Sequence, residues 1–163
     1  MKTSTSPTRN INLDRVADDL WQLVNVPSPT GKERAFLDVY AERLARAGAE
    51  VRLQGSPRSV VGRLKGNRPG RTFQLAGHAD HIDVPHPAPT RTAEAISGRG
   101  AADMKAGLAG ILEVVRVLKQ GGCEFPGEIL VTVYGGHEAP VGDSSALRNL
   151  IACGIVGDAA LVA

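Results

Sequence analysis

The chain has 163 residues, a length at which a single domain can bury about 70% of the surface that its unfolded chain exposes. Hydrophobic residues make up 42% and charged residues 22%, and the mean hydropathy is −0.09, which excludes a disordered or collagen-like chain. The net charge of +2 is spread along the sequence, so we expect no nucleic-acid partner. No apolar run approaches the roughly 18 residues that a membrane helix needs, so we expect no membrane partner.

The start of the chain is polar and lacks the apolar core of a signal peptide. This composition predicts a disordered tail over residues 1–11, a folded part over residues 12–163 and a cytoplasmic protein. Cys123 and Cys153 form no CxxC pair, and we expect both to be buried structural thiols.

Two amphipathic helices are expected first. Apolar residues recur at spacings of three and four from Leu13 to Val24, and Asn12 is a suitable N-cap. A second apolar stripe runs from Phe36 to Ala47, where Gly48 can end the helix in a left-handed conformation.

Short strands and one long loop follow these helices. The segments 50–53, 59–64 and 72–76 are β-branched or alternating, and glycine and proline between them, including residues 66–70, predict tight loops. Residues 85–99 hold three prolines and predict a surface loop.

The second half of the chain begins with the most strongly helical stretch, which opens at Asp103 and ends before Gly121. Residues 128–134 are nearly all apolar and predict a central strand that is covered on both faces. A helix over 143–152 and a strand from 159 to 162 complete the pattern. The alternation predicts an α/β fold with a mixed, mostly parallel sheet flanked by helices, in which ligands bind at the C-terminal ends of the strands.

Histidine and aspartate alternate at the end of the third predicted strand. His78 and Asp80 are two residues apart, so both side chains project to the same side of an extended chain. A carboxylate beside a metal-bound imidazole fixes its tautomer and raises its basicity. His81 and Asp83 have the same spacing, so the register of this motif stays open, and polar surface residues are the alternative explanation.

A second acid, Asp103, follows the glycines at 98 and 100 at the predicted start of a helix. It can be a site residue or an N-cap. Lys105 nearby can balance a carboxylate charge, although a solvated side chain is expected. The GRGAAD segment lacks the third glycine of a dinucleotide fingerprint, so phosphate binding is not predicted.

A third group, His137 and Glu138, comes directly after the predicted central strand. Ionisable groups left unpaired in an apolar site cost several kcal/mol, so packing does not explain them, and they can supply a metal ligand and a general base. Ser144 and Ser145 follow without the G-x-S-x-G turn of a nucleophile, and we interpret them as helix residues.

These three groups, in this order, resemble those of the co-catalytic zinc amidohydrolases and exopeptidases, the family of acetylornithine deacetylase, succinyl-diaminopimelate desuccinylase, aminoacylase and carboxypeptidase G. The segment LVNVPSPTGKER also looks like the opening segment of that family. The resemblance covers roughly residues 13–163. It implies a zinc exopeptidase-like catalytic domain that hydrolyses an amide bond in an N-acyl amino acid or a small peptide.

The resemblance also implies roles for individual residues. His78 would bind one zinc ion, Asp80 would orient His78, and Asp103 would bridge two zinc ions, for which cobalt or manganese can substitute. The family carries a Glu-Glu pair, first a general base and then a ligand, where this chain has His137 and Glu138. Either Glu138 is the base and His137 substitutes as a ligand, or Glu138 is the ligand and His137 occupies the base position. We favour Glu138 as the base, because a carboxylate suits proton transfer to the leaving nitrogen.

Length is a further difference. Members of the family are more than twice as long, and their remaining ligands and their lid or dimerisation domain lie beyond the region seen here. We therefore expect an N-terminal fragment, the first half of the catalytic domain, with a homodimer possible for the full-length protein. The alternative is an inactive fragment, or a binding or regulatory module that keeps the first half of the fold.

Overall fold

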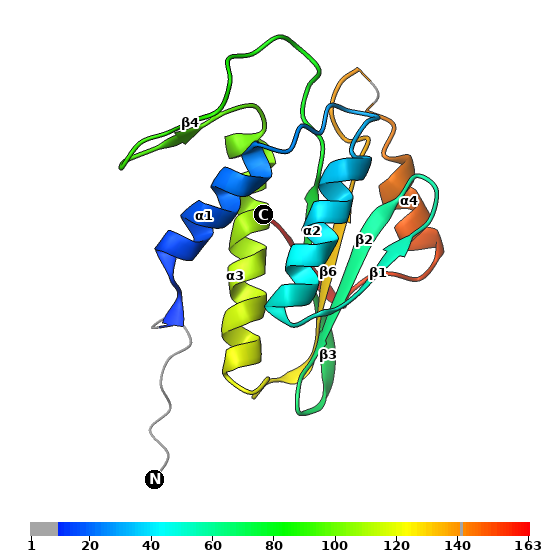
Figure 1. The fold of residues 1–163 in the computed structure, drawn as a ribbon. Helices are drawn as coiled ribbons and strands as arrows, with labels where there is room; N and C mark the ends of the chain where they lie inside the picture. Colours follow the sequence, from blue (N-terminus) through cyan, green and yellow to red (C-terminus); the bar gives the residue numbers. More distant parts are fainter. Residues whose placement is uncertain (1–9, 141) are drawn as a thin grey trace.

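The computed structural model describes residues 10–140 and 142–163, so residues 1–9 of the predicted tail lie outside the described part. Helices and strands alternate along the chain (Figure 1). They are α1 (Leu13–Val24), α2 (Arg34–Ala47), β1 (Glu50–Gln54), β2 (Ser59–Lys65), β3 (Arg68–His78), β4 (Thr90–Arg91), β5 (Ile96–Ser97), a π-helical turn (Ala101–Lys105), α3 (Ala106–Gln120), β6 (Pro126–Tyr134), α4 (Ser145–Ala152) and β7 (Ala159–Val162).

The main sheet has five strands in the order β1-β2-β6-β3-β7. β3 lies between β6 and β7 and runs parallel to both, whereas β1 and β2, and β2 and β6, are antiparallel. The strands β4 and β5 form a separate two-stranded ladder in the long loop after β3. This architecture confirms the predicted mixed α/β sheet flanked by helices.

Helices cover both faces of the sheet. The helices α1, α2 and α3 pack on one face, and α4 packs on the other (Figure 1). Neighbouring residues of a strand contribute to opposite cores. In β2, Val60 belongs to the larger cluster and Val61 to the smaller one beneath α4. In β6, Val131 belongs to the larger cluster and Leu130 to the smaller one. Because side chains alternate across a strand, an apolar run is needed where both faces are covered.

The expected ends of the first two helices are confirmed. The side chain of Asn12 accepts a hydrogen bond from the backbone N–H of Arg15 at 2.9 Å, which satisfies one of the free donors at the start of α1. Gly48 ends α2 with φ of 112°, in the left-handed region that glycine adopts without strain.

Some boundaries differ from the expectations. The segment 66–70 was expected to be a loop, but β3 already begins at Arg68, which pairs with Pro126 before a shift in register. Helix α4 begins at Ser145 rather than at 143, because Ser144 has φ of 53° and does not continue a helix. Cys153 is exposed, contrary to the expected burial, while Cys123 is half-buried against the larger core.

A network of ion pairs joins α1, α2 and α3 beneath the surface, and sequence periodicity gave no sign of it. The side chain of Glu113 is only 2% exposed and pairs with Arg15 at 2.6 Å. Asp19 pairs with both Arg43 and Arg116 at 2.5 Å. No helix of the described residues has the length and apolar character that crossing a bilayer requires.

Candidate metal centre

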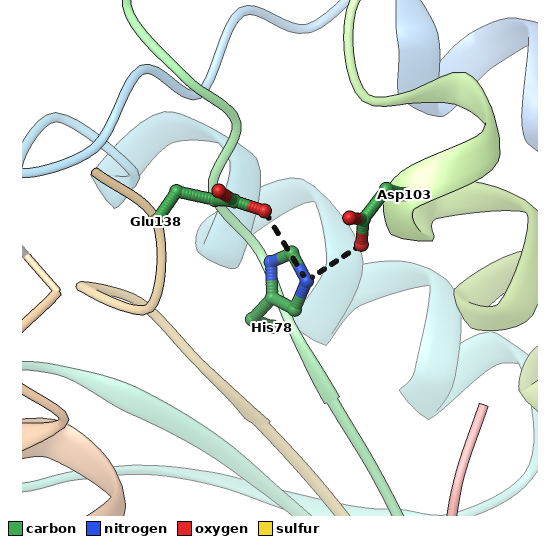
Figure 2. A group of neighbouring side chains, drawn as sticks. All are labelled: His78, Asp103 and Glu138. Atoms are coloured by element: carbon green, nitrogen blue, oxygen red, sulfur yellow. Dashed lines mark hydrogen bonds and ion pairs between the residues drawn. The ribbon is translucent and has the colours of Figure 1, made fainter.

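Three potential ligands meet where β3 and β6 end. His78 is the last residue of β3 and lies opposite Tyr134, the last residue of β6, because the two strands are parallel and in register. Glu138 follows β6, and Asp103 arrives from the π-helical turn. One ligand atom of each of His78, Asp103 and Glu138 lies within 4.8 Å of the others (Figure 2).

The imidazole of His78 is the most buried of the three side chains. Its Nε2 atom is 3.0 Å from Oδ1 of Asp103 and 4.0 Å from Oε1 of Glu138. Figure 2 shows the two carboxylates approaching the same ring nitrogen from different elements. The side chain of His78 is 5% exposed, that of Glu138 18% and that of Asp103 75%, so the site is open from the side of Asp103.

Asp80 supports the opposite side of the imidazole. Nδ1 of His78 lies 3.1 Å from the backbone oxygen of Asp80 and 3.5 Å from its Oδ1. Burial alone would raise the pKa of Asp80, but the neighbouring imidazole of His78 and hydrogen bonds from the backbone N–H groups of Glu138 and His137 outweigh it and hold the pKa below its usual value. Asp80 is therefore a buried carboxylate that keeps its charge.

The same charges act on His78. Burial alone would lower its pKa, but the hydrogen bonds and charges of Asp80 and Asp103 outweigh burial and raise the pKa above the usual value. The carboxylates of Asp80 and Asp103 therefore stabilise a positive charge on the imidazole of His78.

The donor set fits a divalent metal ion. One imidazole nitrogen and two carboxylate oxygens are ligand types that zinc binds. Oδ1 of Asp80 is buried and has no hydrogen-bond partner among the described residues, so it remains free to accept the Nδ1 proton of His78 when Nε2 binds a metal.

The π-helical turn gives Asp103 an extended backbone. Asp103 has φ of −119° and ψ of 96°, so the helix that was expected to open there begins at Ala106 instead. Its side chain makes no capping hydrogen bond with either helix start, so the structure does not support the N-cap explanation. The sulfur of Met104 accepts the backbone N–H of His78 at 3.0 Å, which joins this turn to the end of β3.

Lys105 anchors the turn from the other side. Its side chain was expected in solvent, but the residue is 1% exposed, and Nζ donates to the backbone oxygens of Leu23 and Val26 at 3.1 and 2.8 Å. Nζ also lies 4.6 Å from the ring centre of Phe36. Burial lowers the pKa of Lys105 to about 8. Carbonyl groups at and just beyond the end of α1 thus hold the turn that carries Asp103.

The second histidine of the motif has a different environment. Nε2 of His81 accepts the backbone N–H of Ser28 at 3.2 Å, so Nδ1 carries the proton that bonds to the backbone oxygen of Ile82 at 3.0 Å. Asp83 is exposed and pairs with Lys32. The structure therefore brings the register of His78 and Asp80, rather than that of His81 and Asp83, to Asp103.

His137 lies beside the group rather than within it. Its ring is exposed and stacks on that of His78, with 4.5 Å between the ring centres. Of the pair that follows β6, Glu138 is the residue whose side chain reaches Nε2 of His78. Ser144 and Ser145 lie at the start of α4, as expected.

The segment between α1 and α2 braces both strand ends, and our sequence reasoning gave no function to its residues. Ser28 Oγ donates to the backbone oxygen of Ala79 at 2.7 Å. Oε1 of Glu33 accepts the N–H groups of Gly31 and Gly136, so it ties this segment to the loop that carries Glu138. A Cβ atom at Gly135 would lie 2.7 Å from Cδ of Glu33. In the sequence, the consecutive glycines 135 and 136 after β6 were the feature that could have predicted this close approach of the two segments.

Comparisons with known proteins relate the chain to one peptidase family. Residues 75–162 match the model of peptidase family M20/M25/M40, and this range contains every predicted site residue. The chain is 34% identical over 142 residues to succinyl-diaminopimelate desuccinylase of Methylobacterium radiotolerans, an alignment that covers 77% of this chain and 35% of that protein. The chain thus spans about a third of the length of this curated relative.

Two solved structures have the same fold. An aminopeptidase of Bacillus cereus is 28% identical, with a TM-score of 0.70 over 83% of this chain and 40% of that one. A dipeptidase of Saccharomyces cerevisiae is 20% identical, with a TM-score of 0.78 over 100% of this chain and 41% of that one.

Proposed function

The chain belongs to peptidase family M20/M25/M40, and we propose that it forms the metal-binding first half of a hydrolase that cleaves the amide bond of an N-acyl amino acid or a small peptide. The observation that carries this proposal is the convergence of His78, Asp103 and Glu138 at the ends of two parallel strands. Ligands of α/β proteins bind at this edge of the sheet.

The three residues would hold a divalent cation, with zinc as the expected ion and cobalt or manganese as alternatives. By the family resemblance, Asp103 would contact two ions, and its exposed carboxylate has an oxygen for each. A metal bound here supplies Lewis acidity toward an amide carbonyl and toward water. Asp80 would keep the Nδ1 proton of His78 in place, which leaves Nε2 as the nitrogen that would hold the metal.

The protein must also hold the proton that passes to the leaving nitrogen. The distance of 4.0 Å between Oε1 of Glu138 and Nε2 of His78 supports a ligand role for Glu138. His137, exposed beside His78, then holds the proton. The other assignment, with Glu138 as the base and His137 as a ligand, requires the ring of His137 to turn from its stacked position.

The substrate class rests on the relatives. A desuccinylase and an aminopeptidase are named for removing an acyl group and an amino acid, which supports an amide substrate. The cytoplasmic location and a homodimer of the full-length protein stay predictions. The competing function is a binding or regulatory module that keeps this half of the fold without turnover.

Calorimetric titration of the purified chain with zinc tests the proposal. We expect saturable binding that His78→Ala and Asp103→Ala each weaken at least about tenfold. Asp103 is exposed and caps no helix, so its replacement should leave the thermal unfolding midpoint unchanged. His86→Ala is the matched control, because His86 is exposed and lies outside the group.

Absence of zinc binding would contradict the proposed metal centre. The zinc-loaded chain should next be assayed with N-acetyl amino acids and dipeptides. Turnover that His78→Ala abolishes would support the hydrolase, and zinc binding without turnover would favour the binding module.

A further inference from the structure

Two carboxylates hold the backbone of the loop that carries Glu138. The N–H of Gly136 donates to Oε1 of Glu33 at 3.1 Å. The N–H of Glu138 donates to Oδ2 of Asp80 at 2.7 Å. These two bonds lie on either side of His137 in the sequence. Because both carboxylates bond to the backbone, they set the path of the loop itself rather than the position of one side chain.

Glu33 is in turn held by the chain that follows β3. Its Oε1 also accepts the N–H of Gly31 at 2.6 Å. The N–H and the hydroxyl of Thr30 both donate to the backbone oxygen of His81 at 3.1 Å, and Pro29 forms a parallel bridge with His81. Glu33 therefore connects the strand that supplies the imidazole of the candidate site to the loop after β6.

The fit between Glu33 and this loop is close. A Cβ atom at Gly135 would lie 2.7 Å from Cδ of Glu33, a separation at which one of the two must shift. Gly136 has φ of 75°, in the left-handed region that residues with side chains rarely adopt. Glu33 occupies the N-cap position of α2, but its side chain makes no capping hydrogen bond. Its carboxylate thus serves the loop rather than the helix.

Glu33 lies outside the cavity beside the candidate metal centre. Asp103 and Glu138 line that cavity, which has a volume of about 350 Å³. Glu33 lines a second one, of about 300 Å³, together with Gly135 and Gly136. Among the described residues, Glu33 does not belong to the group of potential ligands. Any effect of Glu33 on a metal bound by that group would therefore pass through the loop.

We propose that Glu33 is a positioning residue of the metal centre. By holding the N–H of Gly136, it keeps Glu138 within reach of the imidazole of His78, and so raises the affinity for the metal. This inference rests on the proposed function, because it takes the three potential ligands as the ligand set. Ligands bind a metal more tightly when their positions are fixed beforehand, and a loop released from Glu33 would have to be ordered again on binding.

Zinc titration of Glu33 variants tests the inference. Glu33→Ala should weaken zinc binding at least about fivefold, and Glu33→Gln, which keeps an acceptor oxygen, should retain most of the affinity. Glu42→Ala is the matched control, because Glu42 lies on α2, is exposed and pairs with Arg46. Its zinc affinity should equal that of the unmodified chain. Circular dichroism verifies the fold, and Glu33→Asp, shorter by one methylene group, should also weaken binding and decides the question if Glu33→Ala does not fold.

A double-mutant cycle separates positioning from a general effect on the fold. In the Glu138→Gln background, Glu33→Ala should change zinc affinity less than about twofold, because the loop then carries no charged ligand to position. An equal loss of affinity in both backgrounds would show that Glu33 acts through the stability of the fold alone, and would overturn the inference.

Hydrogen exchange of the metal-free chain gives a readout that needs no zinc. Glu33→Ala should speed exchange at the amide of Glu138 at least about fivefold, although this N–H bonds to Asp80 rather than to Glu33. The amide of Val131, in the buried part of β6, should keep its rate.

The two measurements distinguish failure of this inference from failure of the proposed function. An unchanged exchange rate at Glu138, or zinc affinity that Glu33→Ala leaves unchanged, would refute the role of Glu33 and leave the metal centre in place. Faster exchange in a chain that binds no zinc would refute the metal centre and retain Glu33 as the residue that positions the loop.

Discussion

The backbone N–H of Glu138 donates a hydrogen bond of 2.7 Å to Oδ2 of Asp80, and this bond joins the end of β6 to the end of β3. Oδ1 of the same carboxylate lies 3.5 Å from Nδ1 of His78. One buried acid therefore positions the imidazole and the loop that carries Glu138.

Replacement of Asp80 by alanine should weaken zinc binding by about 10–100-fold, the range observed when a carboxylate behind a metal-bound histidine is removed. Calorimetric titration measures the change. Asp83→Ala is the matched control, because Asp83 follows His81 at the same spacing but is exposed and pairs with Lys32. Equal zinc affinity of the two variants would show that Asp80 does not orient the site.

Glu138→Gln should lower zinc affinity at least about tenfold if Glu138 is a ligand, because the amide offers no negative charge. His137→Gln should then leave zinc affinity nearly unchanged and reduce turnover instead. Zinc titration and the hydrolysis assay, run on both variants, measure the two effects. The opposite result, with affinity lost in His137→Gln and retained in Glu138→Gln, would assign the base role to Glu138.

The ion pairs of Glu113 should make stability depend on pH. Burial alone would raise the pKa of Glu113, but the hydrogen bonds from Arg15 and Asn12 and the charges of Arg15 and Arg116 outweigh it and hold the pKa below the ordinary value of 4.5. The contribution of Glu113 is thus fully present above about pH 4.5 and is lost as the pH falls through the lower pKa of the folded state.

Glu113→Gln should therefore reduce the free energy of unfolding by about 1–3 kcal/mol at pH 7, and the difference from the unmodified chain should shrink as the pH falls through the lowered pKa of the folded state. Urea denaturation at a series of pH values gives both quantities. Glu42→Gln serves as the control, since Glu42 is exposed and its pair with Arg46 should contribute less than about 0.5 kcal/mol. A difference that grows at low pH would refute the assigned direction.

Lys105→Met should destabilise the chain by about 1–3 kcal/mol, because it leaves the buried backbone oxygens of Leu23 and Val26 without their donor. The free energy of unfolding in urea measures the effect. Lys65→Met, at the exposed end of β2, should change it by less than about 0.5 kcal/mol. Similar values for both variants would mean that the buried ammonium contributes nothing to the fold.

The sequence by itself determined the elements and the places where polar groups leave them. Asn12 and Gly48 mark helix ends because a side-chain acceptor and a left-handed residue act on their own neighbours. The apolar run that ends at Tyr134 indicates a strand covered on both faces. His78 and Glu138 follow such strands, and this order along the chain was enough to predict a site at one edge of the sheet.

Only the tertiary structure decided which of these groups meet. Contacts between residues far apart in the sequence select His78 over His81, extend the backbone at Asp103 and bury Lys105. The hydrogen bond between His78 and Asp103 spans 25 positions, and the one between Lys105 and Leu23 spans 82. Spacing and periodicity describe what a residue does to its neighbours in sequence, whereas burial and charge pairing are set by whichever segments the packed core brings against it.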